Sequence, residues 1–85
     1  MTLYRVAIHI TPRQGLLDPQ GKAVAGALHS LGFGGVKEVH VGRHLVVETD
    51  AADAGAAADS ARSMCTRLLA NPVTEDFEIE SAVPR

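Results

Sequence analysis

The sequence has one cysteine, no tryptophan and an aromatic content of only 4% over its 85 residues. The single thiol, Cys65, cannot form a disulfide within the chain, and a lone thiol is typical of a reducing compartment. A core with so few aromatic rings must be built from Val, Leu, Ile and Ala. A chain this short buries only about 60% of its unfolded surface, and small domains without disulfides or metals often need a partner. The composition therefore indicates an oligomer.

The sequence also lacks a basic cluster and a long apolar run. Its net charge is −2 and its eight Lys and Arg residues are scattered, whereas nucleic-acid-binding domains concentrate them. The longest uncharged stretch, Ala23–Val36, is rich in glycine and shorter than the roughly 18 apolar residues of a membrane span. Arg5 and His9 interrupt the region where a signal peptide is continuously apolar. We expect a cytoplasmic protein with no nucleic-acid or membrane partner.

The N-terminal half predicts a strand followed by a helix. Apolar residues alternate from Tyr4 to Ile10, as in a half-buried strand. The Asp18-Pro19 pair is typical of a helix start, and Gly32 is placed to end that helix. Gly21 and Gly26 each cost up to about 1 kcal/mol of helix propensity, which indicates close packing against a neighbour. The apolar face of the helix consists of Val24, Ala27, Leu28 and Leu31.

The middle of the chain predicts a β-hairpin whose register stays open. The β-branched runs Val36–Val41 and Leu45–Thr49 flank a turn at Gly42-Arg43-His44. A three-residue loop gives the hairpin one apolar face. A two-residue turn at Gly42-Arg43, which glycine-first turn chemistry favours, moves Leu45 and Val47 to the opposite face. That second face would then need a partner to cover it.

The C-terminal part predicts a second helix and a final strand. Asp50 can cap a helix whose apolar stripe runs from Ala54 to Leu69, and Asn71-Pro72 ends it. A strand follows between Val73 and Glu80, with a bulge near its start, at Glu75.

The element order is β-α-β-β-α-β, in a single domain over residues 1–85 with a frayed tail at 81–85. This order predicts an α+β fold with an antiparallel sheet and two helices on one face, a ferredoxin-like arrangement that oligomerises through its sheet. The helix-free face is expected to carry Arg5, Ala7 and His9 and, with the two-residue turn, Leu45 and Val47.

No group of residues predicts catalytic, cofactor-binding or metal chemistry. Cys65 lies on the apolar stripe and is interpreted as a buried small side chain. The glycines of Gly32–Gly35 follow a helix, whereas phosphate-binding loops lead from a strand into a helix. The histidines lack metal-ligand spacing: His9, His29, His40 and His44. The acidic residues of the last strand are interpreted as solvated edge charges: Glu75, Asp76, Glu78 and Glu80.

Five segments, in order along the chain, carry a family resemblance. They are Leu17–Gly21, Ala27–Phe33, Val41–Arg43, Met64-Cys65 and Leu69–Val73. Over about residues 3 to 80 the chain resembles PurS, the small subunit of phosphoribosylformylglycinamidine synthase of purine biosynthesis. Each segment is weak alone, but the set in this order is specific.

The resemblance implies a ligase subunit without catalytic residues of its own. It implies that the chain bridges an ATP-dependent synthetase subunit and a glutaminase subunit, with a contribution to the ammonia path between them. ATP, Mg²⁺ and glutamine would be used by those partners, and this chain would hold no cofactor. The resemblance also implies a homodimer or homotetramer.

Matching the family motifs residue by residue gives six interface candidates: Leu17, Asp18, Gln20, Arg43, Asn71 and Pro72. Helix capping and termination also explain Asp18, Asn71 and Pro72, and a solvated turn also explains Arg43. For Gln20, partner contact is the favoured interpretation.

Two other functions stay open. One is a ferredoxin-like regulatory domain that binds a small metabolite at a subunit interface, near the turn at Gly32–Gly35. The other is a small enzyme, which would need two titratable groups that converge in a cleft.

Overall fold

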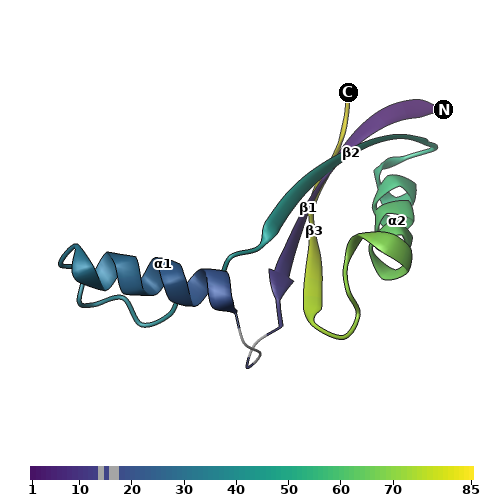
Figure 1. The fold of residues 1–85 in the computed structure, drawn as a ribbon. Coiled ribbons are helices and arrows are strands. Elements are labelled where there is room, and N and C mark those ends of the chain that lie inside the picture. The colour runs from purple at the N-terminus through teal and green to yellow at the C-terminus, as the bar shows by residue number, and fades with distance from the viewer. Residues whose placement is uncertain (14, 16–17) are drawn as a thin grey trace.

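The computed structural model describes residues 1–13, 15 and 18–85. The elements follow one another as β1 (Thr2–Pro12), α1 (Pro19–Ser30), β2 (Arg43–Ala51), α2 (Ala54–Met64), the π-helical turn η1 (Cys65–Leu69) and β3 (Glu75–Pro84) (Figure 1). Among the described residues, no helix has both the length and the apolar character needed to cross a membrane.

The described strands form one antiparallel sheet in the order β2-β1-β3. In the central strand, Ile8 lies opposite Leu45 of β2 and Ile79 of β3, so these three side chains share a face. The alternation predicted for Tyr4–Ile10 is confirmed, because Tyr4, Val6, Ile8 and Ile10 are all buried. The α+β class and the antiparallel sheet are therefore as predicted.

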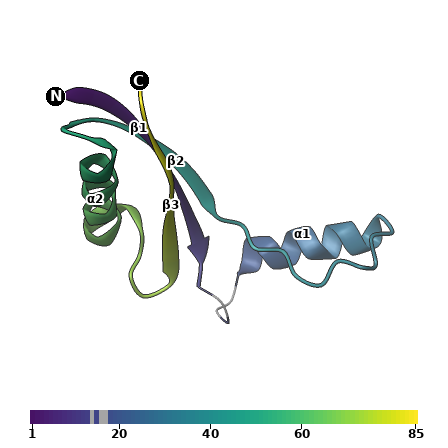
Figure 2. The ribbon, with the colours of Figure 1, turned by 180° about the vertical axis from the view of Figure 1, so that it is seen from behind.

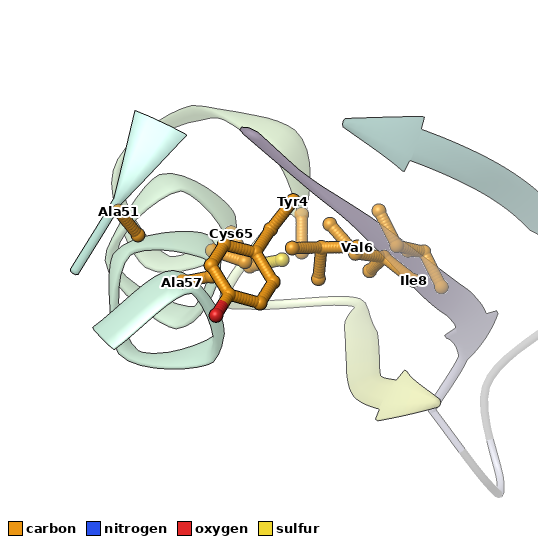
Figure 3. Packing of buried hydrophobic residues seen from close by; sticks show 9 residues of the cluster. Tyr4, Val6, Ile8, Ala51, Ala57 and Cys65 are labelled. Atoms are coloured by element: carbon orange, nitrogen blue, oxygen red, sulfur yellow. The ribbon is translucent and has the colours of Figure 1, made fainter. Parts of the chain in front are cut away.

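One face of the sheet packs against α2 and η1 to form a small core (Figure 3). Alanines on α2 let the helix approach the strands closely, and Cys65 is fully buried beside them. The core residues are Tyr4, Val6, Ile8, Ile10, Ala51, Ala57, Ala61, Cys65 and Ala70. Since the helix side chains are small, most of the apolar volume comes from β1.

The predicted hairpin is wrong in its first strand. Residues 36–42 form no strand within the described chain, and β2 begins at Arg43. The backbone N–H of Val41 donates to Asp18 Oδ2 at 3.0 Å, so this segment is bound to the start of α1 instead of to a strand ladder. Pairing of β2 with β1 places Leu45 and Val47 on the face that packs against α2. Val46 is 49% exposed on the opposite, open face.

The second difference is the position of α1, which extends away from the sheet while α2 covers it (Figures 1 and 2). The radius of gyration is 16.2 Å, against about 12 Å for a compact domain of this length. The apolar helix face predicted to enter the core is uncovered, with Val24 41% and Leu31 75% exposed. Among the residues of α1, all of which are described, Gly21 is the only one that is buried.

The end of α1 is as predicted. Gly32 has a φ of +99°, a conformation that glycine adopts without a steric cost. The N–H of Phe33 donates to the carbonyl of Leu28 at 3.0 Å, and that of Gly32 donates to His29 at 3.1 Å. These two bonds are the Schellman pattern, which satisfies carbonyls at a helix end.

The N-cap of α2 is Asp53 and not Asp50. Its carboxylate accepts a hydrogen bond from the N–H of Ala56 at 2.8 Å. The prediction failed because β2 continues through Asp50 to Ala51, which leaves Asp53 as the acidic residue directly before the helix.

The C-terminal strand is longer than predicted, and its bulge lies elsewhere. Residues 81–84 pair with β1, and the N–H of Arg85 donates to the carbonyl of Leu3 at 2.8 Å, so the expected frayed tail is part of the sheet. The register shifts between Ala7 and Ile8, which pair with Ser81 and Ile79. The unpaired bulge residue is therefore Glu80.

Candidate subunit interface

Asp18 organises the base of α1. Its Oδ1 accepts a hydrogen bond from the N–H of Gly21 and its Oδ2 accepts one from the N–H of Val41, each at 3.0 Å. These two donors lower the pKa of the Asp18 carboxyl below its ordinary value. The predicted N-cap is confirmed, and the same carboxylate also fixes a segment 23 residues further along the chain.

Gly21 lets that segment lie directly on the helix. A Cβ at this position would come within 1.9 Å of the Val39 carbonyl oxygen. The close packing predicted for Gly21 is therefore present. A Cβ at Gly26 would meet no atom within 4 Å, so this chain alone gives no packing reason for the second glycine.

Gln20 lies beside this contact on the first turn of α1, with its side chain exposed. A pocket of about 470 Å³ opens between the helix start and residues 37–40. Its lining includes Asp18, Lys22, Lys37 and His40. Leu17, also predicted as an interface residue, lies outside the described residues.

Arg43 binds two other parts of the chain. Its Nη2 donates to the carbonyl of Leu69 and to Glu75 Oε1, both at 2.8 Å. The same Glu75 oxygen accepts a hydrogen bond from the N–H of Asn71 at 2.8 Å. Arg43 therefore ties the start of β2 to the connection between η1 and β3, and is not a freely solvated turn residue.

Asn71 and Pro72 shape that connection. Asn71 Oδ1 accepts a hydrogen bond from the N–H of Val73 at 2.9 Å, which closes a side-chain turn. The carbonyl of Pro72 accepts one from Arg13 Nη2 at 3.0 Å, and Arg13 also pairs with Asp76 at 3.3 Å. Both residues end the helical segment, as predicted.

The described candidates thus form two groups. Asp18 and Gln20 lie at the base of α1, and Arg43, Asn71 and Pro72 lie around Glu75. Only Gly42 separates Val41, bound by the first group, from Arg43, which belongs to the second. A Cβ at Gly42 would come within 2.3 Å of the Ile10 carbonyl oxygen, so close contact with β1 holds this junction in place.

Sequence reasoning missed Glu75 and Arg13. Glu75 was interpreted as a solvated edge charge, but its side chain is only 24% exposed and accepts bonds from Arg43 and Asn71. The spacing of Asn71 and Glu75 along the chain was a usable signal, because short loops commonly close with such side-chain to backbone bonds. The pairing with Arg43 spans 32 residues and had no local signal.

Exposed apolar side chains accompany both groups. On α1 and the turn after it, Leu31 is 75% and Phe33 56% exposed. Near the second group, Leu68 is 83% and Val73 72% exposed. Uncovered apolar side chains of this size, close to polar residues with fixed positions, are typical of an interaction surface.

Cys65 does not contribute chemistry to this surface. It is fully buried, as predicted, and burial raises the pKa of its thiol. A buried protonated thiol packs as a small apolar side chain and is a poor nucleophile.

Comparisons with known proteins identify the family. The PurS family, described as phosphoribosylformylglycinamidine (FGAM) synthase, matches residues 5–82. The chain is 42% identical over 76 residues to the PurS subunit of this synthase from Mycobacterium leprae, which covers 88% of this chain and 91% of the relative.

Two solved structures share the fold. Thermus thermophilus PurS is 40% identical, with a TM-score of 0.82 over 94% of both chains. A chain of the PurLQS structure from Thermotoga maritima is 28% identical, with a TM-score of 0.85 over 95% of this chain and 99% of that one. The chain belongs to the PurS family of phosphoribosylformylglycinamidine synthase subunits.

Proposed function

We propose that this chain is a non-catalytic subunit that bridges the ATP-dependent synthetase and glutaminase subunits of phosphoribosylformylglycinamidine synthase. Membership of the PurS family makes it a subunit of this ligase of purine biosynthesis. The observation that supports the bridging role is α1, which extends from the sheet with its apolar face uncovered. A helix with an uncovered apolar face buries little apolar surface when the chain folds alone, and it buries more when it docks on a partner.

The proposal extends to self-association as a dimer or tetramer. Among the described residues, exposed apolar side chains lie on the α1 face around Leu31 and on the open face of the sheet around Val46. A second copy could cover either region, and the small core of this chain makes such cover energetically valuable. The solved PurS structures show the same fold as this chain. The number of copies in the assembly is part of the proposal.

The remaining roles follow from the bridging role. ATP, Mg²⁺ and glutamine are then handled by the partner subunits, in the cytoplasm, and this chain holds no cofactor of the reaction. Its contribution to the ammonia path is to fix the separation and orientation of the two larger subunits. The fixed groups around Asp18 and Glu75 suit this task, because positions held by backbone hydrogen bonds present a constant surface to a partner.

Reconstitution tests the proposal. The matching synthetase and glutaminase subunits are assayed for amidine formation with glutamine and, separately, with ammonia, in the presence and absence of this chain. We expect the glutamine-dependent rate to require this chain and the ammonia-dependent rate to be largely independent of it. A glutamine-dependent rate that is equal with and without the chain would refute the bridging role.

Single substitutions test which residues of this chain contact the larger subunits. Gln20→Ala and Phe33→Ser remove exposed side chains near the base and the far end of α1, and we expect both to weaken assembly. Ser63→Ala, an exposed change on α2, is the matched control. Sizing chromatography of the three-subunit mixture separates lost assembly from lost folding.

A second candidate function rests on the pocket beside α1. Its volume of about 470 Å³ falls in the range of small-molecule sites. Its lining holds both basic and acidic side chains, which suits a polar metabolite that carries charges of both signs: Lys22, Lys37, His40, Asp18 and Glu38. The pocket lies at the helix start and not at the Gly32–Gly35 turn. A metabolite that binds there would raise the thermal midpoint of the isolated chain.

A further inference from the structure

The open face of the sheet brings together two imidazoles and a carboxylate from three different strands. His9 of β1 and His44 of β2 are direct cross-strand partners, and their ring centroids lie 4.8 Å apart. His9 Nε2 lies 2.6 Å from Glu80 Oε2 of β3. The ligand atoms of the three residues all lie within 4.8 Å of one another.

Glu80 lies at the bulge in β3, on the face that Glu78 shares with its partner His9. Ile79 pairs with Ile8 and Ser81 pairs with Ala7, so Glu80 is the extra residue between two ladder positions. Its side chain is half exposed on the face opposite α2, beside His9. An extra residue at this point re-aims one side chain without breaking the sheet, which is how bulges commonly serve binding sites.

We propose that His9, His44 and Glu80 bind a divalent transition-metal ion of the zinc type. Two imidazole nitrogens and one carboxylate oxygen form a donor set found in zinc sites, with the fourth position left to water or another ligand. Mg²⁺ and Ca²⁺ prefer oxygen donors alone, so this set discriminates against them.

The surroundings favour a cation at this position. Glu78 is the direct cross-strand partner of His9, which adds a second carboxylate to the same face. Arg5 and Arg85 lie further along the sheet, where both pair with Glu48, Arg5 at 3.9 Å. The side chains of His9 and Glu80 are 45% and 51% exposed, so an ion can reach them from solvent.

This site is independent of the bridging function. Its ligands belong to the open face of the sheet, whereas the surface proposed to bridge the larger subunits is centred on α1, so only a second copy packed around Val46 would come near the site. A bound ion would link all three strands across the open face and stabilise the folded state relative to the unfolded chain. Loss of the site would leave the glutamine-dependent reaction of the complex as it is, so the two proposals fail separately.

Zinc titration of the untagged full chain tests the site, because a polyhistidine tag would itself bind the metal. Isothermal calorimetry with Zn²⁺ is expected to give one ion per chain, and Mg²⁺ no measurable binding. The chain loaded with Co²⁺ is expected to show the strong visible bands of a four-coordinate ion. Thermal unfolding with excess Zn²⁺ is expected to shift upward by several degrees.

Variants assign the ligands. His9→Gln, His44→Asn and Glu80→Gln keep polar side chains and are each expected to weaken zinc binding at least tenfold. His29→Ala, which removes an imidazole at the end of α1, is the matched control and is expected to bind zinc as the parent does. NMR of the parent chain supplies a check that needs no variant: zinc should shift the ring signals of His9 and His44 and leave those of His29 and His40 unchanged. The absence of zinc binding, or undiminished binding by His9→Gln and His44→Asn, would overturn the proposal.

Discussion

The body of the molecule and its helical arm differ in how much of their apolar surface they bury. The body, formed by the sheet, α2 and η1, fully buries apolar side chains on one face of its central strand, with Val6, Ile8 and Ile10 at 0% exposure. The arm, residues 18–42, is formed by α1 and the extended segment that returns beside it. It leaves Leu31 75% exposed and contributes only Gly21 to the buried residues described. The body has a core of its own, whereas the arm leaves its apolar face uncovered.

This difference is visible in how each region is held. Apolar packing holds the body, and Figure 3 shows its side chains converging from β1 and α2. The described contacts at the base of the arm are polar and few: the Asp18 carboxylate and the close approach of Gly21 to Val39. Polar contacts fix direction at a small net gain in free energy. These contacts join the two segments of the arm to each other, and the close approach of Gly42 to the Ile10 carbonyl oxygen places the end of the arm against β1.

The largest predicted effect contrasts Ile8→Ala in the body with Leu31→Ala in the arm. Ile8→Ala should lower the free energy of unfolding by about 2–5 kcal/mol, because it leaves a cavity in a fully buried site. Leu31→Ala should change it by less than about 0.5 kcal/mol in dilute solution. Urea unfolding followed by circular dichroism measures both. Equal costs for the two changes would mean that the arm belongs to the folded core.

The two helix glycines offer a finer test within the arm. Gly21→Ala should cost about 1–3 kcal/mol, because the added Cβ would lie 1.9 Å from the Val39 carbonyl oxygen and displace the segment bound to Asp18. Gly26→Ala should gain up to about 1 kcal/mol of helix propensity, because the added Cβ would meet no atom within 4 Å from other parts of the described chain. Amide exchange over residues 19–30 and 39–41 reports each change. If Gly26→Ala instead weakens self-association, a second copy packs on that face of α1.

Arg43 and Glu75 test the part of the body that lies next to the end of the arm. Arg43→Met should cost about 1 kcal/mol, since it removes an ion pair whose arginine is half exposed. A double-mutant cycle with Glu75→Gln should show coupling of about 0.5–1 kcal/mol. Strict additivity would show that the two side chains do not interact in solution.

The smallest effect is a pH dependence centred on Asp18. Its pKa is lowered in the folded chain from an ordinary value of 3.8, because Gly21 and Val41 donate hydrogen bonds to the carboxylate. The stabilisation is therefore complete above about pH 4 and is lost as the pH falls through the lowered folded value. NMR titration of the carboxyl should give a midpoint below 3.8. Val41 should lose its amide protection over the same range, and a midpoint at or above the ordinary value would contradict the structure.

Local sequence patterns were sufficient to predict β1, α1 and α2 as elements. The alternation of apolar residues predicts β1, and apolar residues at helical spacing predict α2. The Asp18-Pro19 pair and Gly32 predict the two ends of α1. These features depend on residues within one or two turns of each other. The fold class and the family followed from the order of such segments.

The sequence did not predict that the arm extends away from the sheet. The run Val36–Val41 has the composition of a strand, but its backbone is bound by Asp18 and passes over Gly21, contacts that join residues about 20 positions apart. The bulge at Glu80 was also missed, since register depends on the partner strand and not on the bulged residues alone. The meeting of His9, His44 and Glu80 depends on that register, so spacing along the chain could not reveal it.

The mass of the untagged chain in solution tests the central claim most directly. Sedimentation velocity should give at least twice the 8.9 kDa of a single chain. Leu31→Asp should lower the mass toward that of one chain and leave the circular dichroism of the body unchanged. A single chain of 8.9 kDa at every concentration, with α1 protected from amide exchange, would contradict the account, because the arm would then be stable without a second copy.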